Sequence, residues 1–221
     1  MFMALSERAY AGAYEGNYYH AYCEAVRKMA AQDPILMAER SGAQYHSEEK
    51  RFSLKYCGQQ YYVSFPGGEV WLPGRQQVPI SDRTLLVLYL TMASGLPLRG
   101  QWLAFIELPG GPHHHAPFMQ EAAQPIAQVF GHNPDLLIHA SKQLGGNPIT
   151  MGDKAVVIPA LPRIPLAVVL WRADEEFPAK ATVLFDASAP TYLDTAALFV
   201  LGINCCLKLV QAAYEIICRY G

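Results

Sequence analysis

The sequence predicts an α+β fold in which helices pack on an antiparallel or mixed sheet and a long C-terminal helix closes the chain. Strand-like alternation clusters in hairpins between residues 52 and 72, and helical segments then interrupt further strands without regular β-α-β alternation. An apolar stripe at helical spacing covers residues 192–219. With 221 residues the chain can bury a substantial core, so we expect a single domain over residues 1–221.

The N-terminal third is expected to contain one helix and three strands. Four tyrosines at i, i+4 spacing predict a helix with an aromatic face over the first 32 residues, stopped by Asp33-Pro34: Tyr10, Tyr14, Tyr18 and Tyr22. We expect this face to pack on the core with its hydroxyls at the rim. Residues 52–56 and 61–65 predict a hairpin, and residues 70–72 predict a third short strand.

The middle of the chain reads as a buried helix followed by an apolar strand. Ser81 or Asp82 is the expected N-cap of a helix over residues 85–93, with Gly95 just beyond its end. Residues 101–108 predict a strand, and the glycine- and proline-rich segment that follows it predicts a rigid loop.

The C-terminal half alternates helices and strands before the final helix. Helices are expected from about Pro117 to Phe130 and from Pro134 to Leu144. Strands are expected at residues 155–158, 166–171 and 181–185, with three prolines limiting the pairing of the first two: Pro159, Pro162 and Pro165.

Composition excludes several classes of protein. The chain is 52% hydrophobic and 16% charged with a net charge of -2, which is not the basic footprint of a nucleic-acid-binding protein. No secretory signal pattern and no uninterrupted apolar run of membrane-spanning length is recognisable, so we expect a cytoplasmic protein without a membrane span. The five cysteines are scattered without a C-x-x-C pair, so neither an iron–sulfur cluster nor a cysteine zinc site is expected.

The histidine triplet His113, His114 and His115 carries the main functional hypothesis. Imidazole is a common ligand of zinc, iron and cobalt, and in an extended segment residues 113 and 115 point one way and residue 114 the other. His132 and His139 are the candidate partners in a metal site. Together with low charge and 13 tyrosines, the triplet predicts an apolar pocket for a metal tetrapyrrole, haem or corrinoid, with a histidine axial ligand. Three arginines are candidates for its carboxylates: Arg99, Arg163 and Arg172.

Two alternatives remain open. A small-molecule metalloenzyme would combine two histidines with a carboxylate from residues 174–176, and an interaction protein or homodimer would use the excess apolar surface as an interface. The sequence contains neither a G-x-S-x-G nucleophile elbow nor a glycine-rich phosphate loop, and no catalytic residue is assigned.

Several blocks resemble the uncharacterised prokaryotic family known as domain of unknown function 3786. They are LGG with Asp153, the stretch IPALPRIPLAVVLWRADEEFPAKATVLFDASAPTYL, and the preceding WLAFIELPGG, VFG and FPGGEV, so the resemblance covers about residues 10–200. It implies an origin in anaerobic bacteria or archaea and a context of corrinoid metabolism, but no reaction. Some such proteins carry an N-terminal iron–sulfur module, which this chain lacks the cysteine cluster to form.

Overall fold

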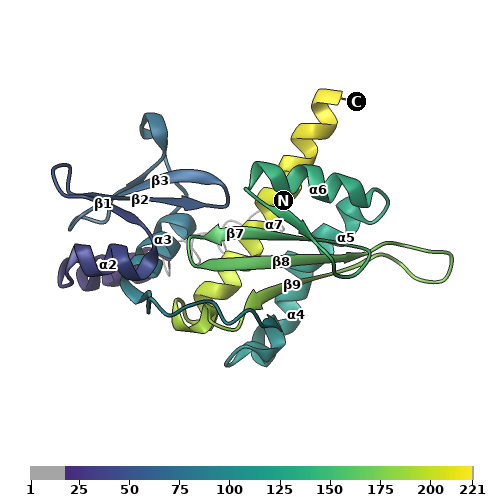
Figure 1. The fold of residues 1–221 in the computed structure, drawn as a ribbon, viewed down its shortest axis with the longest axis horizontal. Helices are drawn as coiled ribbons and strands as arrows, with labels where there is room; N and C mark the ends of the chain where they lie inside the picture. The colour runs from purple at the N-terminus through teal and green to yellow at the C-terminus, as the bar shows by residue number, and fades with distance from the viewer. Residues whose placement is uncertain (1–17, 221) are drawn as a thin grey trace, which may run out of the picture. The chain divides into compact units, whose positions relative to one another are not determined.

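The computed structural model describes residues 18–220, and it confirms the α+β class (Figure 1). The chain divides into two compact units. Within the described residues, unit 1 comprises residues 18–54 and 60–95, and unit 2 comprises residues 55–59 and 96–220. The single-domain organisation stays a prediction, and the part of the tyrosine stripe at residues 10 and 14 lies outside the described residues.

Unit 1 is built on a four-stranded sheet in the order β1-β2-β3-β4. The strands are β1 (Gln44–His46), β2 (Arg51–Tyr56), β3 (Gln59–Ser64) and β4 (Val70–Trp71), which confirms the predicted hairpin and third strand. Phe52, Leu54 and Val63 alternate with more exposed residues and are buried, as period-two patterning requires.

Two helices of unit 1 differ from the predictions, one at residues 34–41 and one at residues 80–92. The first described helix covers residues 18–30. Asp33 then does more than stop it, because its carboxylate accepts a hydrogen bond from the N–H of Ile35 (2.8 Å) and caps a second helix, α2 (Pro34–Ser41). The prediction of Ser81 or Asp82 as an N-cap is wrong: α3 (Ile80–Met92) begins earlier, after Pro79, and encloses both residues.

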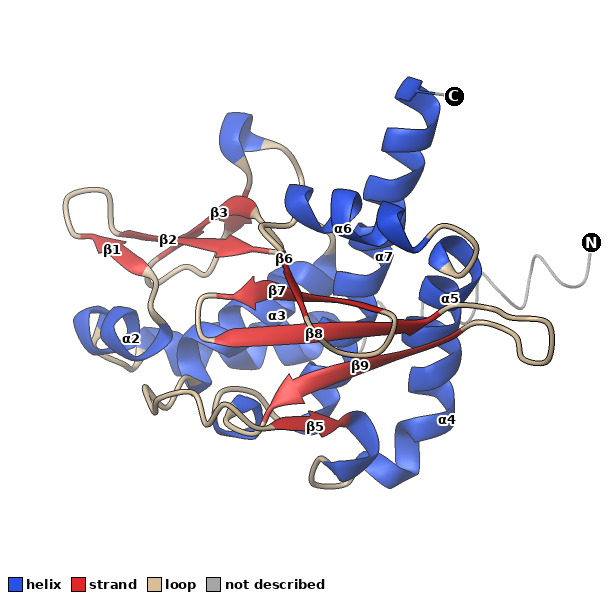
Figure 2. Cartoon of the chain, turned by 45° about the vertical axis from the view of Figure 1, so that its right-hand side comes forward, coloured by secondary structure: helices blue, strands red, loops and turns tan. Residues whose placement is uncertain are grey.

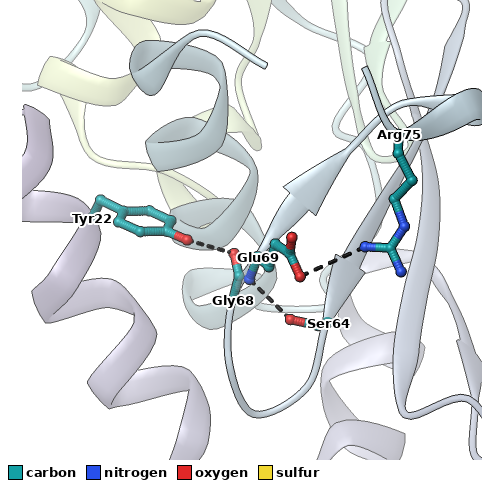
Figure 3. A network of polar contacts seen from close by, with 5 residues as sticks. All are labelled: Tyr22, Ser64, Gly68, Glu69 and Arg75. Atoms are coloured by element: carbon teal, nitrogen blue, oxygen red, sulfur yellow. Dashed lines mark hydrogen bonds and ion pairs between the residues drawn. The ribbon is translucent and has the colours of Figure 1, made fainter. Parts of the chain in front are cut away.

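Of the predicted aromatic face, Tyr22 packs into unit 1 as expected, but its hydroxyl is buried and does not lie at the rim. Tyr22 is buried, and its hydroxyl donates to the carbonyl of Gly68 at 2.8 Å (Figure 3). In the turn after Gly68, the N–H of Glu69 donates to Oγ of Ser64 at 2.9 Å, and the Glu69 carboxylate lies 3.7 Å from the guanidinium of Arg75 (Figure 3). These contacts fix the β3–β4 turn against the helix.

Unit 2 contains a five-stranded antiparallel sheet in the order β5-β9-β8-β7-β6. Its strands are β5 (Trp102–Ala104), β6 (Asn147–Ile149), β7 (Lys154–Leu161), β8 (Ile164–Trp171) and β9 (Lys180–Asp186). The strand expected at residues 101–108 is therefore short, and a 3-10 turn follows from Phe105 to Glu107.

The prediction that prolines limit pairing of β7 and β8 is wrong. Both strands run through their prolines, and Pro159 lies directly opposite Pro165 beside a register shift. Opposed residues of an antiparallel ladder alternate between pairs that exchange N–H···O bonds and pairs that do not, and a pair of the second kind accommodates two prolines. The long β7–β8 hairpin thus becomes the centre of the sheet.

Helices pack on one face of this sheet (Figures 1 and 2). They are α4 (His115–Phe118), α5 (Gln124–Phe130), α6 (Pro134–Gln143) and α7 (Thr195–Tyr220), and a π turn from Met119 to Ala123 joins α4 to α5. Three buried phenylalanine rings, Phe105, Phe118 and Phe185, pack together, and the Phe105 and Phe118 centroids lie 4.2 Å apart. The half-buried ring of Phe199, on α7, packs against Phe105 and Phe118.

Helix α7 is more apolar than the sequence analysis allowed for. By length and composition, Thr195–Arg219 could cross a membrane, because an 18-residue window within it has a mean hydropathy of 1.8. Of that window, 56% is buried inside the fold. A core helix of this kind satisfies the same criterion as a membrane span. The predicted cytoplasmic location stays a prediction.

Candidate functional site

A cleft in unit 2 has a volume of about 820 Å³. One wall is the helical segment that runs from the π turn into α5, and the other is the end of the β8–β9 hairpin with its connecting loop. Volumes of this size are typical of sites for cofactors and drug-sized ligands.

The helical wall presents five side chains to the cleft, two of them amides: Met119, Gln120, Ala123, Gln124 and Ala127. The sequence accounts for the π turn beneath them, because Pro125 has no N–H to donate to the carbonyl one helical turn earlier. The helix widens instead, and the N–H of Gln124 donates to the carbonyl of Met119, five residues back. Such π turns occur frequently at functional sites.

The sheet wall combines exposed aromatic rings with cations. Trp171, the last residue of β8, lies opposite Lys180, the first residue of β9. Trp171 is 43% exposed and Phe177, in the loop between the strands, is 59% exposed. The Lys180 ammonium lies 6.0 Å from the Phe177 ring centroid, and Arg172 completes this side of the cleft.

The carboxylates in the cleft are already engaged by backbone groups. Asp174 accepts hydrogen bonds from the N–H groups of Glu176 (2.9 Å) and Phe177 (2.7 Å), which shapes the loop. Asp153 accepts from the N–H of Arg172 at 2.9 Å. Neither the Arg172 guanidinium nor the Lys180 ammonium has an ion-pair partner within residues 18–220. The cleft therefore offers two cations beside two aromatic rings.

The structure corrects the expected conformation of the histidine triplet. Residues 111–114 form a 3-10 turn and His115 begins α4, so the segment is helical and not extended. The prolines and glycines that precede the triplet allow this tight turn. His113 and His114 are exposed, while Nδ1 of His115 is buried without a hydrogen-bond partner. None of the three lines the cleft.

The remaining candidate metal ligands lie apart from the triplet. His132 is exposed in the turn between α5 and α6. His139 lies on α6, where its Nδ1 is 2.8 Å from the carbonyl oxygen of Asp135, and it lines a smaller pocket of about 440 Å³ together with Lys154. In the described part of the chain, no three histidine, cysteine, aspartate or glutamate side chains gather closely enough to hold a metal ion.

The three candidate arginines do not converge either. Arg163 lies in the turn before β8 and Arg172 follows its last residue, so about 30 Å of extended strand separates them. The backbone N–H of Arg99, at the β5 end of the sheet, donates to Asp186. Of the predicted site residues, the cleft contains only Arg172 and, from the metalloenzyme alternative, Asp174.

Sequence reasoning missed most of the cleft. Its lining comes from two segments, residues 119–127 and 171–181, with Asp153 between them in the sequence. The one available signal was the run from Trp171 to Lys180, in which aromatic and cationic residues flank an acidic turn. Nothing in that run shows which helix faces it.

Residues 33–207 match the model of the family described as Domain of unknown function (DUF3786). No curated protein and no solved structure matches the chain.

Proposed function

Since the chain belongs to the DUF3786 family, whose description assigns no function, we propose from the cleft itself that unit 2 binds a small planar organic anion. The observation that carries the proposal is the placement of Arg172 and Lys180, two cations without ion-pair partners among the described residues, beside the exposed rings of Trp171 and Phe177.

Each part of this arrangement matches one part of such a ligand. Large exposed aromatic rings favour stacking on an apolar planar group. Arg172 can pair with a carboxylate, phosphate or sulfonate through two parallel hydrogen bonds, and Lys180 adds a second positive charge. Because Oδ1 of Asp174 accepts two hydrogen bonds from the loop backbone, the loop keeps its shape without drawing on either cation.

A histidine-ligated tetrapyrrole does not fit this cleft as well. Its walls would suit the macrocycle, and Arg172 and Lys180 would suit its carboxylates. No histidine lines the cleft, however, and the sulfur of Met119 is the only soft ligand among its lining residues. Haem and corrinoid binding through His113, His114 or His115 therefore stays a separate proposal, which requires a different surface.

Titration with 8-anilinonaphthalene-1-sulfonate, an aromatic anion with a planar naphthalene ring, tests the proposed function. We expect saturable binding by dye fluorescence, weakened about tenfold or more in the Arg172→Gln/Lys180→Gln double variant and by rising salt. The control variant Lys142→Gln/Arg219→Gln makes the same change of charge at exposed positions outside the cleft and should bind like the parent protein.

Equal binding by both double variants would refute the proposal. Hemin and hydroxocobalamin belong in the same titration. A shifted visible spectrum that disappears when His113, His114 and His115 are all replaced by alanine would favour the tetrapyrrole hypothesis instead.

A second candidate function, self-association, is favoured by the outer face of α7. Leu207, Val210, Tyr214 and Ile217 follow the 3-4 spacing of a helix-pairing seam, and three of them are about half exposed, at 50%, 56% and 46% for Leu207, Tyr214 and Ile217. Light scattering of the parent and of Leu207→Gln/Ile217→Gln over a concentration series tests it: a dimer lost in the variant supports it, and a monomer at every concentration refutes it.

A further inference from the structure

We propose that the planar anion is a nitrogen heterocycle carrying a phosphate, of the nucleotide type, and that Gln120 and Gln124 recognise its ring edge. This inference rests on the proposed function, because it names the class of ligand for the same cleft.

The two glutamines are the feature that a plain aromatic anion does not explain. Both line the cleft, both are exposed, and neither amide has a hydrogen-bond partner within the described chain. A carboxamide presents a donor and an acceptor together, which is the pattern that the edge of a nitrogen heterocycle also presents. A hydrocarbon ring would leave both amides without partners on binding, at a cost in affinity.

The two walls divide the recognition between them. The rings of Trp171 and Phe177 provide a stacking surface that accepts any planar ring. The amides of the helical wall provide hydrogen bonds, which select a ring with polar atoms at its edge. The other side chains of the helical wall are apolar: Met119, Ala123 and Ala127. Besides the indole N–H of Trp171, the two amides are the uncharged hydrogen-bonding groups among the described side chains that line the cleft.

The phosphate would bind to side chains and not to a backbone loop. The sequence contains no glycine-rich phosphate loop, the feature through which many nucleotide-binding proteins hold a phosphate. Arg172 and Lys180 supply the positive charge from adjacent ends of paired strands, so no such loop is needed.

Competition with the bound dye compares a matched set of probes. The set consists of the 5′-monophosphates of adenosine, guanosine, cytidine and uridine, flavin mononucleotide, 1-naphthyl phosphate as a phosphate on a hydrocarbon ring, and adenosine as a heterocycle without phosphate. We expect at least one heterocyclic phosphate to bind about tenfold more tightly than 1-naphthyl phosphate and adenosine.

The glutamine variants decide what that preference means. Gln120→Leu/Gln124→Leu should remove the preference for the heterocycle while leaving the affinity for 1-naphthyl phosphate unchanged within threefold. The control Gln128→Leu/Gln143→Leu, at exposed positions that do not line the cleft, should preserve the preference for the heterocycle.

The outcomes separate this inference from the proposed function. If 1-naphthyl phosphate binds as tightly as every heterocyclic phosphate, or if the glutamine variant keeps the preference, the heterocycle is refuted and the aromatic anion site stands. If neither the dye nor any phosphate binds, the proposed function fails and the inference fails with it.

Discussion

Replacing Asp186 by asparagine should destabilise unit 2 and change how its stability depends on pH. Asp186 is 2% exposed at the end of β9, and its oxygens accept hydrogen bonds from the N–H groups of Arg99 (3.0 Å), Gly100 (2.8 Å) and Ser188 (2.9 Å). Burial by itself would raise the pKa of this carboxyl, but hydrogen bonds from residues 99, 100 and 188 outweigh it, and the pKa is lowered.

The size of the effect follows from the geometry. An asparagine keeps one carbonyl oxygen, which can still serve the two N–H groups that share Oδ1, but its amide NH₂ would face the N–H of Gly100. A hydrogen bond to a charged group contributes about 1.5–3 kcal/mol, and leaving a buried donor unsatisfied costs about 1–3 kcal/mol. We expect the free energy of unfolding to fall by about 3 kcal/mol at pH 7.

The pH dependence has a definite sign. Because the pKa of Asp186 is lower in the folded protein than the value of about 3.9 in an unfolded chain, its contribution is complete above that value. The contribution is lost as pH falls through the folded pKa. The difference in stability between the parent and Asp186→Asn should therefore be constant from pH 7 to about 5 and should shrink below about pH 4.

Urea denaturation followed by circular dichroism at a series of pH values measures both quantities. Asp194→Asn is the matched control, because Asp194 caps α7 through the N–H of Ala197 (2.8 Å) and asparagine is an equally good cap. The control should change stability by less than about 0.5 kcal/mol. A loss below about 1 kcal/mol for Asp186→Asn, or a difference that does not shrink in acid, would refute the reasoning.

Three further predictions concern packing, thiols and capping. Gly202→Ala should lower the free energy of unfolding by about 1–2 kcal/mol in the same assay. The added Cβ would lie 2.6 Å from the Phe118 ring, which is stacked on Phe105. Equal or greater stability of the variant would contradict this prediction. Ellman's reagent at pH 8 should label only the two exposed cysteines, Cys23 and Cys218, in the native protein. Burial raises the pKa of the Cys206 thiol, and the neighbouring Cys205 raises that pKa further. Fast labelling of more than two cysteines would disprove this prediction. Asp33→Ala should cost about 1 kcal/mol and Asp33→Asn almost nothing, and equal losses would exclude a capping role.

The fold was largely predictable because its strongest signals are local. The β2–β3 hairpin, α6 and α7 follow from alternation, capping residues and apolar stripes that each lie within one segment of the chain. Errors occurred where a local rule had two solutions. Asp33-Pro34 can end one helix or begin the next, and a proline pair can break a ladder or fit a pair that exchanges no hydrogen bonds.

The histidine triplet shows the limit of reasoning from residue type. Three adjacent imidazoles suggested metal ligands, but whether they can bind a metal depends on the backbone conformation and on which other side chains lie nearby. A 3-10 turn exposes two of them and leads the third into α4. The candidate partners His132 and His139 follow later in the chain, and the fold does not gather them into a group that could hold a metal ion.

The sequence by itself determined the α+β class, the family resemblance and most helices and strands, because hydrophobic periodicity and turn residues act over short distances. Only the tertiary structure decided the cleft. Its walls come from residues 119–127 and 171–181, and sheet pairing together with helix packing determines that Gln120 and Gln124 face the same space as Arg172. Long-range packing leaves no local trace in the sequence, so the side chains that we propose bind a ligand could be recognised only after the chain was folded.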